Sequence, residues 1–131
     1  MSMKASETAI RAFFETLNTG DLEALRPLVN RATWKPMVKN LTSAESYSGD
    51  AIIDDFLRPV RGIFRPGDPK VAIDVLVADE NAVAVETRGT GKLADGRNYE
   101  NRYAWFFELN AGRIVEIHEY LDSLYVSGLA R

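Results

Sequence analysis

The first half of the chain carries apolar residues at helical spacing. From Ser6 to Leu17 they recur at positions i, i+3, i+4 and i+7, which predicts an amphipathic helix with Ser6 as its N-cap. A second apolar stripe follows Asp21 and is shortened by Pro27, and a third lies within residues 48–64. We therefore expect three helices before residue 65.

After the proline- and glycine-rich segment 65–69 the period changes to two. Alternating residues predict strands over 71–78, 82–90, 99–109 and 113–122, while the tail 123–131 shows no clear pattern. Strands joined by such short loops must pair antiparallel, and strands this long should curl strongly. The sequence therefore predicts an α+β fold: a curved antiparallel sheet, covered on one face by three N-terminal helices, forming a cone with a pocket.

Composition narrows the class of protein. A chain of 131 residues fits one domain, residues 1–131. The net charge of −3 and the pI near 5.2 argue against a nucleic-acid binder. Cysteine is absent and His118 is the only histidine, so a thiolate nucleophile and a site with two histidines are excluded. We therefore expect neither a metal nor a cofactor.

Hydropathy also bears on location. The sequence has no apolar run close to the roughly 18 residues that a transmembrane helix needs. Its first residues lack the apolar core of a signal peptide. We expect a cytoplasmic protein that does not enter a membrane.

Strand parity gives conflicting answers near the C-terminus. Burying the apolar set Val115, Ile117 and Leu121 leaves His118 and Asp122 in water. On the preceding strand the same rule buries Asn101, Tyr103, Trp105 and Phe107. The conflict disappears if a partner subunit covers the second face, or if the polar residues line a pocket. We expect a combination of the two.

The stretch from Tyr99 to Asp122 resembles the C-terminal hairpin of SnoaL-like proteins. These belong to the superfamily of cone-shaped folds that includes nuclear transport factor two and ketosteroid isomerase. Residues 17–22 (Leu-Asn-Thr-Gly-Asp-Leu) and 47–52 (Tyr-Ser-Gly-Asp-Ala-Ile) resemble the other two landmarks of the family. Together these segments extend over nearly the whole chain, and their order and spacing are more specific for the fold than for a reaction.

The resemblance implies that the cone interior receives Asn101, Tyr103, His118, Tyr120 and Asp122. Asp122 stands where SnoaL-like cyclases and the related epoxide hydrolases carry an acid/base aspartate. Desolvation in an aromatic cavity favours the protonated form of a carboxylic acid, as general catalysis requires. The alternative is a carboxylate at the rim that caps the following turn. His118 is the second catalytic candidate. The alternative is that His118 only packs against a neighbouring strand or lies in an interface.

Other residues are expected to contact a substrate, since ligand cavities are mostly apolar with a few polar groups. They are Trp34, Tyr47, Phe56, Arg88, Asn101, Tyr103 and Tyr120. The alternative for the aromatic residues is a place in the core. Glu86, Arg88 and Asp122 also offer a carboxylate–guanidinium–carboxylate set like that of the epoxide hydrolases, although Glu-Thr-Arg reverses the family's order. The alternative for Glu86 and Arg88 is a pair of charges on a wet sheet face.

The chain also departs from ketosteroid isomerase at three places. Phe13 replaces the tyrosine that donates to the oxyanion, and Ala104 replaces the second donor. Lys35-Pro36 stands where the isomerase carries its aspartate base. Classical steroid isomerisation is therefore not expected.

These residues together predict a cofactor-independent enzyme of the SnoaL-like type: a cyclase, isomerase or hydrolase acting on a hydrophobic carbonyl or epoxide compound. Asp122 would move the proton, and His118, Asn101 and Tyr103 would position the substrate or a water. A homodimer would form through the open sheet face. Two alternatives remain: a protein of the same shape that binds a small ligand without chemistry, and a dimerisation or scaffold domain.

Overall fold

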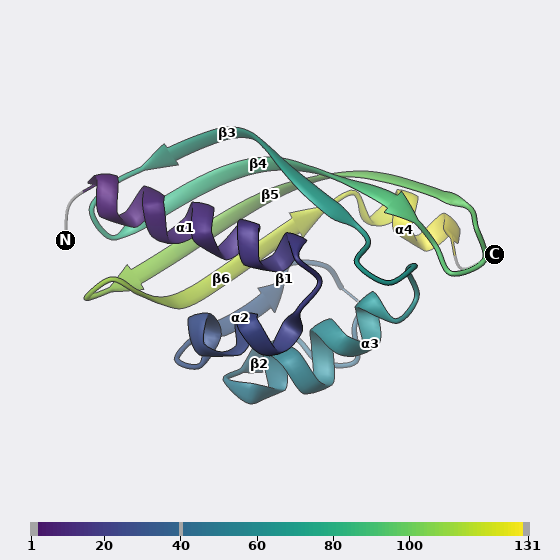
Figure 1. The fold of residues 1–131 in the computed structure, drawn as a ribbon, viewed down its shortest axis with the longest axis horizontal. Coiled ribbons are helices and arrows are strands. Elements are labelled where there is room, and N and C mark those ends of the chain that lie inside the picture. The colour runs from purple at the N-terminus through teal and green to yellow at the C-terminus, as the bar shows by residue number, and fades with distance from the viewer. Residues whose placement is uncertain (1–2, 40, 130–131) are drawn as a thin grey trace.

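Three helical segments precede the long strands, as the apolar stripes predict. The computed structural model describes residues 3–39 and 41–129. The helical segments are α1 (Met3–Asn18), α2 (Leu22–Val29) and a π-helical segment η1 (Ile52–Leu57) that continues into α3 (Arg58–Arg61) (Figure 1). Asp21 caps α2 through a hydrogen bond from Ala24 N to its Oδ1 at 3.1 Å. The expected N-cap at Ser6 is wrong: Ser6 lies inside α1, buried, and its hydroxyl donates to the Asp79 carbonyl.

Six strands form one sheet. The four expected long strands are β3 (Lys70–Ala78), β4 (Ala82–Lys92), β5 (Asn98–Asn110) and β6 (Arg113–Leu121), each antiparallel to the next. Two short strands were not expected: β1 (Thr33–Pro36) and β2 (Tyr47–Ser48). The order is β2-β1-β6-β5-β4-β3, and β1 runs parallel to β6. The sheet is therefore mixed, which corrects the expectation of a purely antiparallel one.

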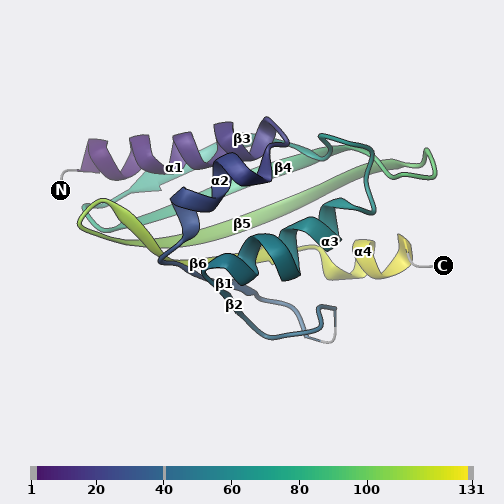
Figure 2. The ribbon, with the colours of Figure 1, turned by 60° about the horizontal axis from the view of Figure 1, so that its bottom comes forward.

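The first three helices cover one face of the curved sheet (Figures 1 and 2). Between them lies an apolar core that includes Phe13 and Phe14 of α1 and Phe107 of β5. Asn18 ties the end of α1 to β3, since its amide donates to the Val71 carbonyl and accepts from the Val71 amide. The opposite face of β3 to β6 is not covered by any described helix. The α+β architecture with one covered face is confirmed.

A β-bulge sets which side chains of β6 face the core. The β5–β6 register shifts between Glu108 and Leu109. Ile114 and Ile117 are consequently both buried although they are three positions apart. Beyond the bulge, Ile117 and Glu119 lie on the core side, while His118 and the residues in phase with it lie on the outer side.

A short helix that the sequence did not predict, α4 (Ser123–Leu129), follows β6. Asp122 Oδ1 accepts the Tyr125 amide at 3.1 Å at the start of this helix. Tyr125, Val126 and Leu129 pack against a small apolar cluster of Phe64, Leu93 and Tyr99, apart from the main core. None of the helices within the described ranges has the length and apolarity needed to span a membrane.

Candidate functional site

The inner face of the sheet is lined by aromatic rings. Trp34 of β1 and Trp105 of β5 pack edge to face with centroids 5.5 Å apart. Phe56 of η1 contacts Trp34 on one side and stacks on Tyr47 on the other, at 5.4 and 4.9 Å. Aromatic walls of this kind exclude water from any polar group that lies between them.

One carboxyl group lies within this aromatic lining. Glu119 of β6 is opposite Trp105 in the β5–β6 register and 9% exposed. Its Oε1 accepts the indole N–H of Trp34 at 3.0 Å. Burial raises the pKa of Glu119 to about 7, against the opposing effects of the Trp34 hydrogen bond and the positive charge of Arg61. The carboxyl therefore exchanges a proton near neutral pH.

The second oxygen of Glu119 has no hydrogen-bond partner among the described residues. Among the described residues, only Trp34 gives this side chain a hydrogen bond. Every described buried side-chain oxygen or nitrogen that is closed off from solvent has a hydrogen-bond partner. Since the second oxygen has none, solvent must reach it.

A chain of polar side chains extends from this point towards the end of the sheet. Tyr103 of β5 is a diagonal neighbour of Glu119 on the inner face, and its hydroxyl shares a hydrogen bond with that of Tyr99. Asn101 donates to the Tyr99 hydroxyl at 3.1 Å and to the Asp122 carbonyl at 3.4 Å. Burial raises the pKa of both tyrosines, so both hydroxyls stay protonated.

Arg61, the last residue of α3, brings a positive charge to the same region. It donates to the main-chain carbonyl of Pro69 at 3.1 Å. Burial lowers the pKa of its guanidinium, while Tyr103, Asp68 and Glu119 act on it in the opposite direction. The inner face therefore combines a titrating carboxyl, protonated hydroxyls and a cation within an aromatic lining.

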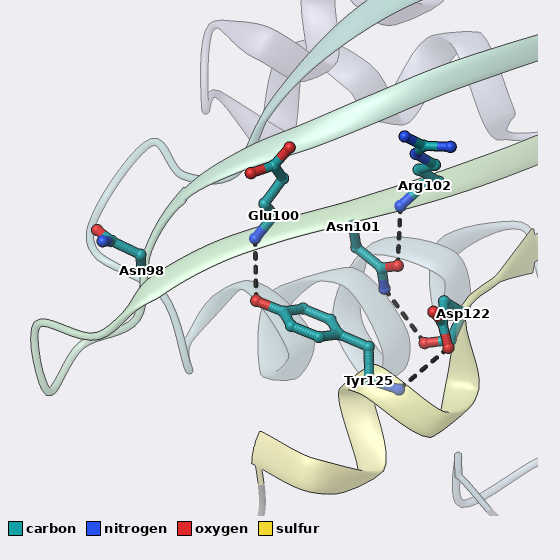
Figure 3. Close-up of a pocket in the computed structure, with 6 residues that line it drawn as sticks. All are labelled: Asn98, Glu100, Asn101, Arg102, Asp122 and Tyr125. Carbon is teal, nitrogen blue, oxygen red and sulfur yellow. Dashed lines mark hydrogen bonds between the residues drawn. The ribbon is translucent and has the colours of Figure 1, made fainter.

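A hollow opens between β5 and α4 at the end of this chain (Figure 3). Tyr125 crosses it and accepts the Glu100 amide at 3.1 Å, while Asp122 caps α4. Asn101 lines the hollow and also bonds to Tyr99, so it joins the hollow to the inner network. Asp122 is exposed here, at the rim rather than inside.

The structure brings together five of the residues expected at the site and separates the others. Trp34, Tyr47, Phe56, Asn101 and Tyr103 all lie on the inner side.

The expected interior position of His118 and Tyr120 is wrong, because the β6 parity places both on the outer face. Tyr120 is 44% exposed. His118 Nε2 lies 3.2 Å from Glu116 Oε1, next to the Phe106 ring.

The set of Glu86, Arg88 and Asp122 is not assembled either. Arg88 and Glu86 are exposed on the outer face of β4, where Arg88 pairs with Asp74 at 2.9 Å. Asp122 lies at the α4 end. Among the residues that the structure describes, no hydrogen bond or ion pair joins Asp122 to Glu86 or Arg88. Within the described ranges, no three histidine or carboxylate side chains lie close enough to hold a metal ion.

Sequence reasoning missed Glu119 and Arg61 as site residues. The signal for Glu119 was the apolar-in rule itself, since burying Ile117 and Leu121 also buries the residue between them. The family resemblance favoured the opposite face. Arg61 carries no local signal, because only the tertiary fold places the end of α3 over the sheet.

Comparison with known proteins agrees with this architecture. The sequence model of a family described as SnoaL-like domain matches residues 10–117. An NTF2-like protein from Burkholderia thailandensis superimposes with a TM-score of 0.81 and 20% identity, covering 96% of this chain and 97% of the other. Comparison with curated proteins gives no significant match.

Two further solved structures have the same fold. A candidate polyketide cyclase from Xanthomonas campestris pv. campestris has a TM-score of 0.73 and 17% identity over 96% of both chains. A candidate isomerase from Bacillus subtilis has a TM-score of 0.75 and 18% identity, over 95% of this chain and 91% of the other. At these identities the likeness is one of fold.

Proposed function

Since the chain belongs to the SnoaL-like domain family, we propose that it is a small-molecule enzyme that isomerises or cyclises a hydrophobic carbonyl compound, with Glu119 as its acid/base. The observation that carries the proposal is a buried carboxyl with a pKa near 7 and a free oxygen, set among aromatic rings. A general base works best when its pKa lies near the working pH. Candidate cyclases and isomerases share the fold, which agrees with such chemistry.

In the proposed reaction the ionised Glu119 removes a proton from the carbon next to the substrate carbonyl. The electron pair of that C–H bond moves into the carbonyl group and forms an enolate. Where the substrate has a double bond next to that carbon, the enolate is a dienolate, and the protonated Glu119 returns the proton to its far carbon, which gives an isomer. Where the substrate has a second carbonyl group, the enolate carbon attacks the carbon of that group. The new C–C bond closes a ring, the C=O π bond opens to an alkoxide, and Glu119 gives its proton to that oxygen. No oxidant or reductant is consumed.

Asp122, which the family resemblance implied as the acid/base, has a structural role in this proposal. Its carboxylate caps α4 and is exposed. We assign it to holding the helix at the rim and assign proton transfer to Glu119. His118 lies on the outer face, and we assign it no part in catalysis.

Deuterium exchange tests the proposal without the natural substrate. A hydrophobic ketone such as 2-tetralone is incubated in heavy water, and the loss of its α-proton signal is followed by proton NMR. We expect the wild-type protein to accelerate exchange and Glu119→Gln to lose about a hundredfold or more of that acceleration. Asp122→Asn, the matched control, should exchange nearly as fast as wild type. Undiminished exchange in Glu119→Gln would contradict the assignment.

A second candidate is binding of a small hydrophobic ligand without chemistry. It is supported by the dense packing of Trp34, Trp105 and Phe56 around Glu119, which also suits a carboxyl that only orders the core. In that case 2-tetralone would bind, raising the melting temperature, but would not exchange its α-protons.

We also propose that a second copy of the chain covers the outer sheet face. Two rows of side chains cross this face from β3 to β6 at equivalent positions. One consists of Val75, Glu86, Ala104 and Tyr120, and the other of Val77, Ala84, Phe106 and His118. The apolar members are exposed, Val77 by 64%, and a face of this character is typical of a protein interface.

A further inference from the structure

Two arginines of the described chain are partly buried, and they are held in different ways. Arg26 of α2 pairs with carboxylates of Glu23, Asp50 and Asp54, each within 2.9 Å. Arg61 donates to main-chain carbonyls of Pro69 and, at 3.5 Å, of Asp68. Among the residues that the structure describes, no carboxylate oxygen lies within 4.0 Å of its guanidinium.

This difference has opposite consequences for the two cations. The hydrogen bonds from Arg26, that to Glu23 first, raise the pKa of its guanidinium. Burial lowers the pKa of Arg61. A cation that is withdrawn from water without a paired anion is costly to the fold, and the cost falls when an anion arrives.

The charged and titratable groups that face Arg61 are Asp68, Tyr103 and Glu119. Asp68 is engaged elsewhere, because its Oδ2 accepts the main-chain N–H of Lys92 at 3.0 Å. Tyr103 is protonated, as burial raises its pKa. Glu119 is the proton acceptor of the proposed reaction and becomes neutral when it takes the proton. At that moment the remaining anion that faces Arg61 is Asp68, which lies beyond ion-pair distance of the guanidinium.

The guanidinium is also shaped to accept an oxygen anion. It has five N–H donors in a planar fork, and the two main-chain carbonyls fix its orientation without neutralising it. Donors oriented in advance and shielded from water stabilise a developing negative charge better than solvent does.

We propose that Arg61 binds the carbonyl oxygen of the substrate and stabilises the negative charge that forms there when Glu119 removes the neighbouring proton. This inference rests on the proposed function, and it defines the substrate class further: a hydrophobic molecule whose carbonyl group becomes an enolate. A planar aromatic carboxylate imitates that enolate without reacting.

Paired ligands test Arg61 in the full-length protein. The affinities of 2-naphthoate and its neutral counterpart 2-naphthamide are measured by calorimetry at about pH 6, where a group with a pKa near 7 is mostly protonated. We expect the carboxylate to bind wild type about tenfold or more tightly than the amide. Arg61→Met should abolish this preference, because it weakens binding of the carboxylate much more than binding of the amide, whose neutral carbonyl oxygen gains less from the cation. Arg61→Lys, which keeps the charge but not the fork, should retain part of it.

Arg58→Met is the matched control, since Arg58 lies on the same helix but pairs with Glu23 at the surface. It should keep the wild-type preference. A preference that persists in Arg61→Met, or no preference in wild type, would overturn the inference. The two proposals fail separately: unchanged α-proton exchange in Glu119→Gln removes the proposed function, whereas the naphthoate preference tests Arg61 without any turnover.

Discussion

At the scale of single residues, the main feature is Glu119, a buried carboxyl group without a cation in contact among the described residues. Ionised carboxylates are rarely buried without a cation in contact, because the lost hydration costs more than one neutral hydrogen bond returns. Here the contact partner is the neutral indole of Trp34, and Arg61 acts only at longer range. The protein therefore keeps a carboxyl that is half neutral at ordinary pH, which a purely structural glutamate would not need.

The free energy of unfolding should depend on pH in a way that reflects this pKa. The pKa of Glu119 is raised from 4.5 to about 7 on folding, so the folded state holds the proton more tightly than the unfolded state. Its contribution is fully present below about pH 4.5 and is lost as the pH rises to about 7. Glu119→Gln cannot ionise, so we expect its stability relative to wild type to increase by about 3 kcal/mol between about pH 5 and about pH 8.

Urea denaturation of both proteins across this range checks the expectation. The comparison with Glu119→Gln is necessary because other carboxylates act in the opposite direction. Hydrogen bonds from Arg26 and Arg88 lower the pKa values of Asp54 and Asp74, whose contributions are lost as the pH falls. Both proteins contain Asp54 and Asp74, so the contributions of these residues cancel in the difference between the two stabilities. A stability difference that does not change with pH would show that Glu119 titrates normally.

The sequence could identify part of this site. Tyr103 and Asn101 are on the inner face because an uninterrupted strand alternates strictly. His118 was misplaced because the resemblance was preferred to the apolar pattern of its own strand, Ile117 and Leu121. The bulge near Leu109, which buries both Ile114 and Ile117, depends on pairing between strands and has no signature within β6.

At the scale of elements, close approach between neighbouring strands shapes the site. Gly89 of β4 lies under the ring of Tyr103, and a Cβ at Gly89 would be 2.9 Å from Tyr103 Cε1. The glycine is required there for space. Tyr103 could not otherwise reach Tyr99 while lying flat against β4.

We therefore expect Gly89→Ala to destabilise the protein by about 1–3 kcal/mol, because the ring must move and the core repack. It should also break the contact between the Tyr99 and Tyr103 hydroxyls. Gly128→Ala in α4 is the matched control, since its Cβ would meet no atom within 4 Å. That change should be neutral or stabilise by up to about 1 kcal/mol, as alanine favours a helix. Urea denaturation measures both, and equal stability of the two variants would refute the steric argument.

Elements with a strong local pattern were predictable, and those that depend on distant partners were not. The stripe of Phe13 and Phe14 and the alternation of β3 to β6 are repeated over many residues. By contrast β1 has four residues and pairs with β6, which is far away in sequence, and β2 has two residues and pairs only with β1. The α4 helix has only seven residues, so no helical period of apolar positions can repeat within it.

At the scale of the whole molecule, the helices leave one side of a six-stranded sheet uncovered. Ala84 lies in the middle of that face, between Val77 of β3 and Phe106 of β5. Its small exposed side chain leaves room for a partner chain to approach. If a second copy covers this face, a long charged side chain introduced at Ala84 must fit between the two copies and lose its hydration.

We expect the wild-type protein to sediment at twice its chain mass of 14.6 kDa. Ala84→Arg should weaken the dimer about a hundredfold or more, since the bulk and the lost hydration of the side chain together cost several kcal/mol and each 1.4 kcal/mol is a factor of ten. The monomer should keep its fold, because Ala84 faces away from the core. Ala12→Arg, an equally small exposed site on α1, should leave the dimer intact. Sedimentation velocity over a concentration series distinguishes these outcomes. A wild-type monomer, or an undisturbed dimer in Ala84→Arg, would show that the outer face is not the interface.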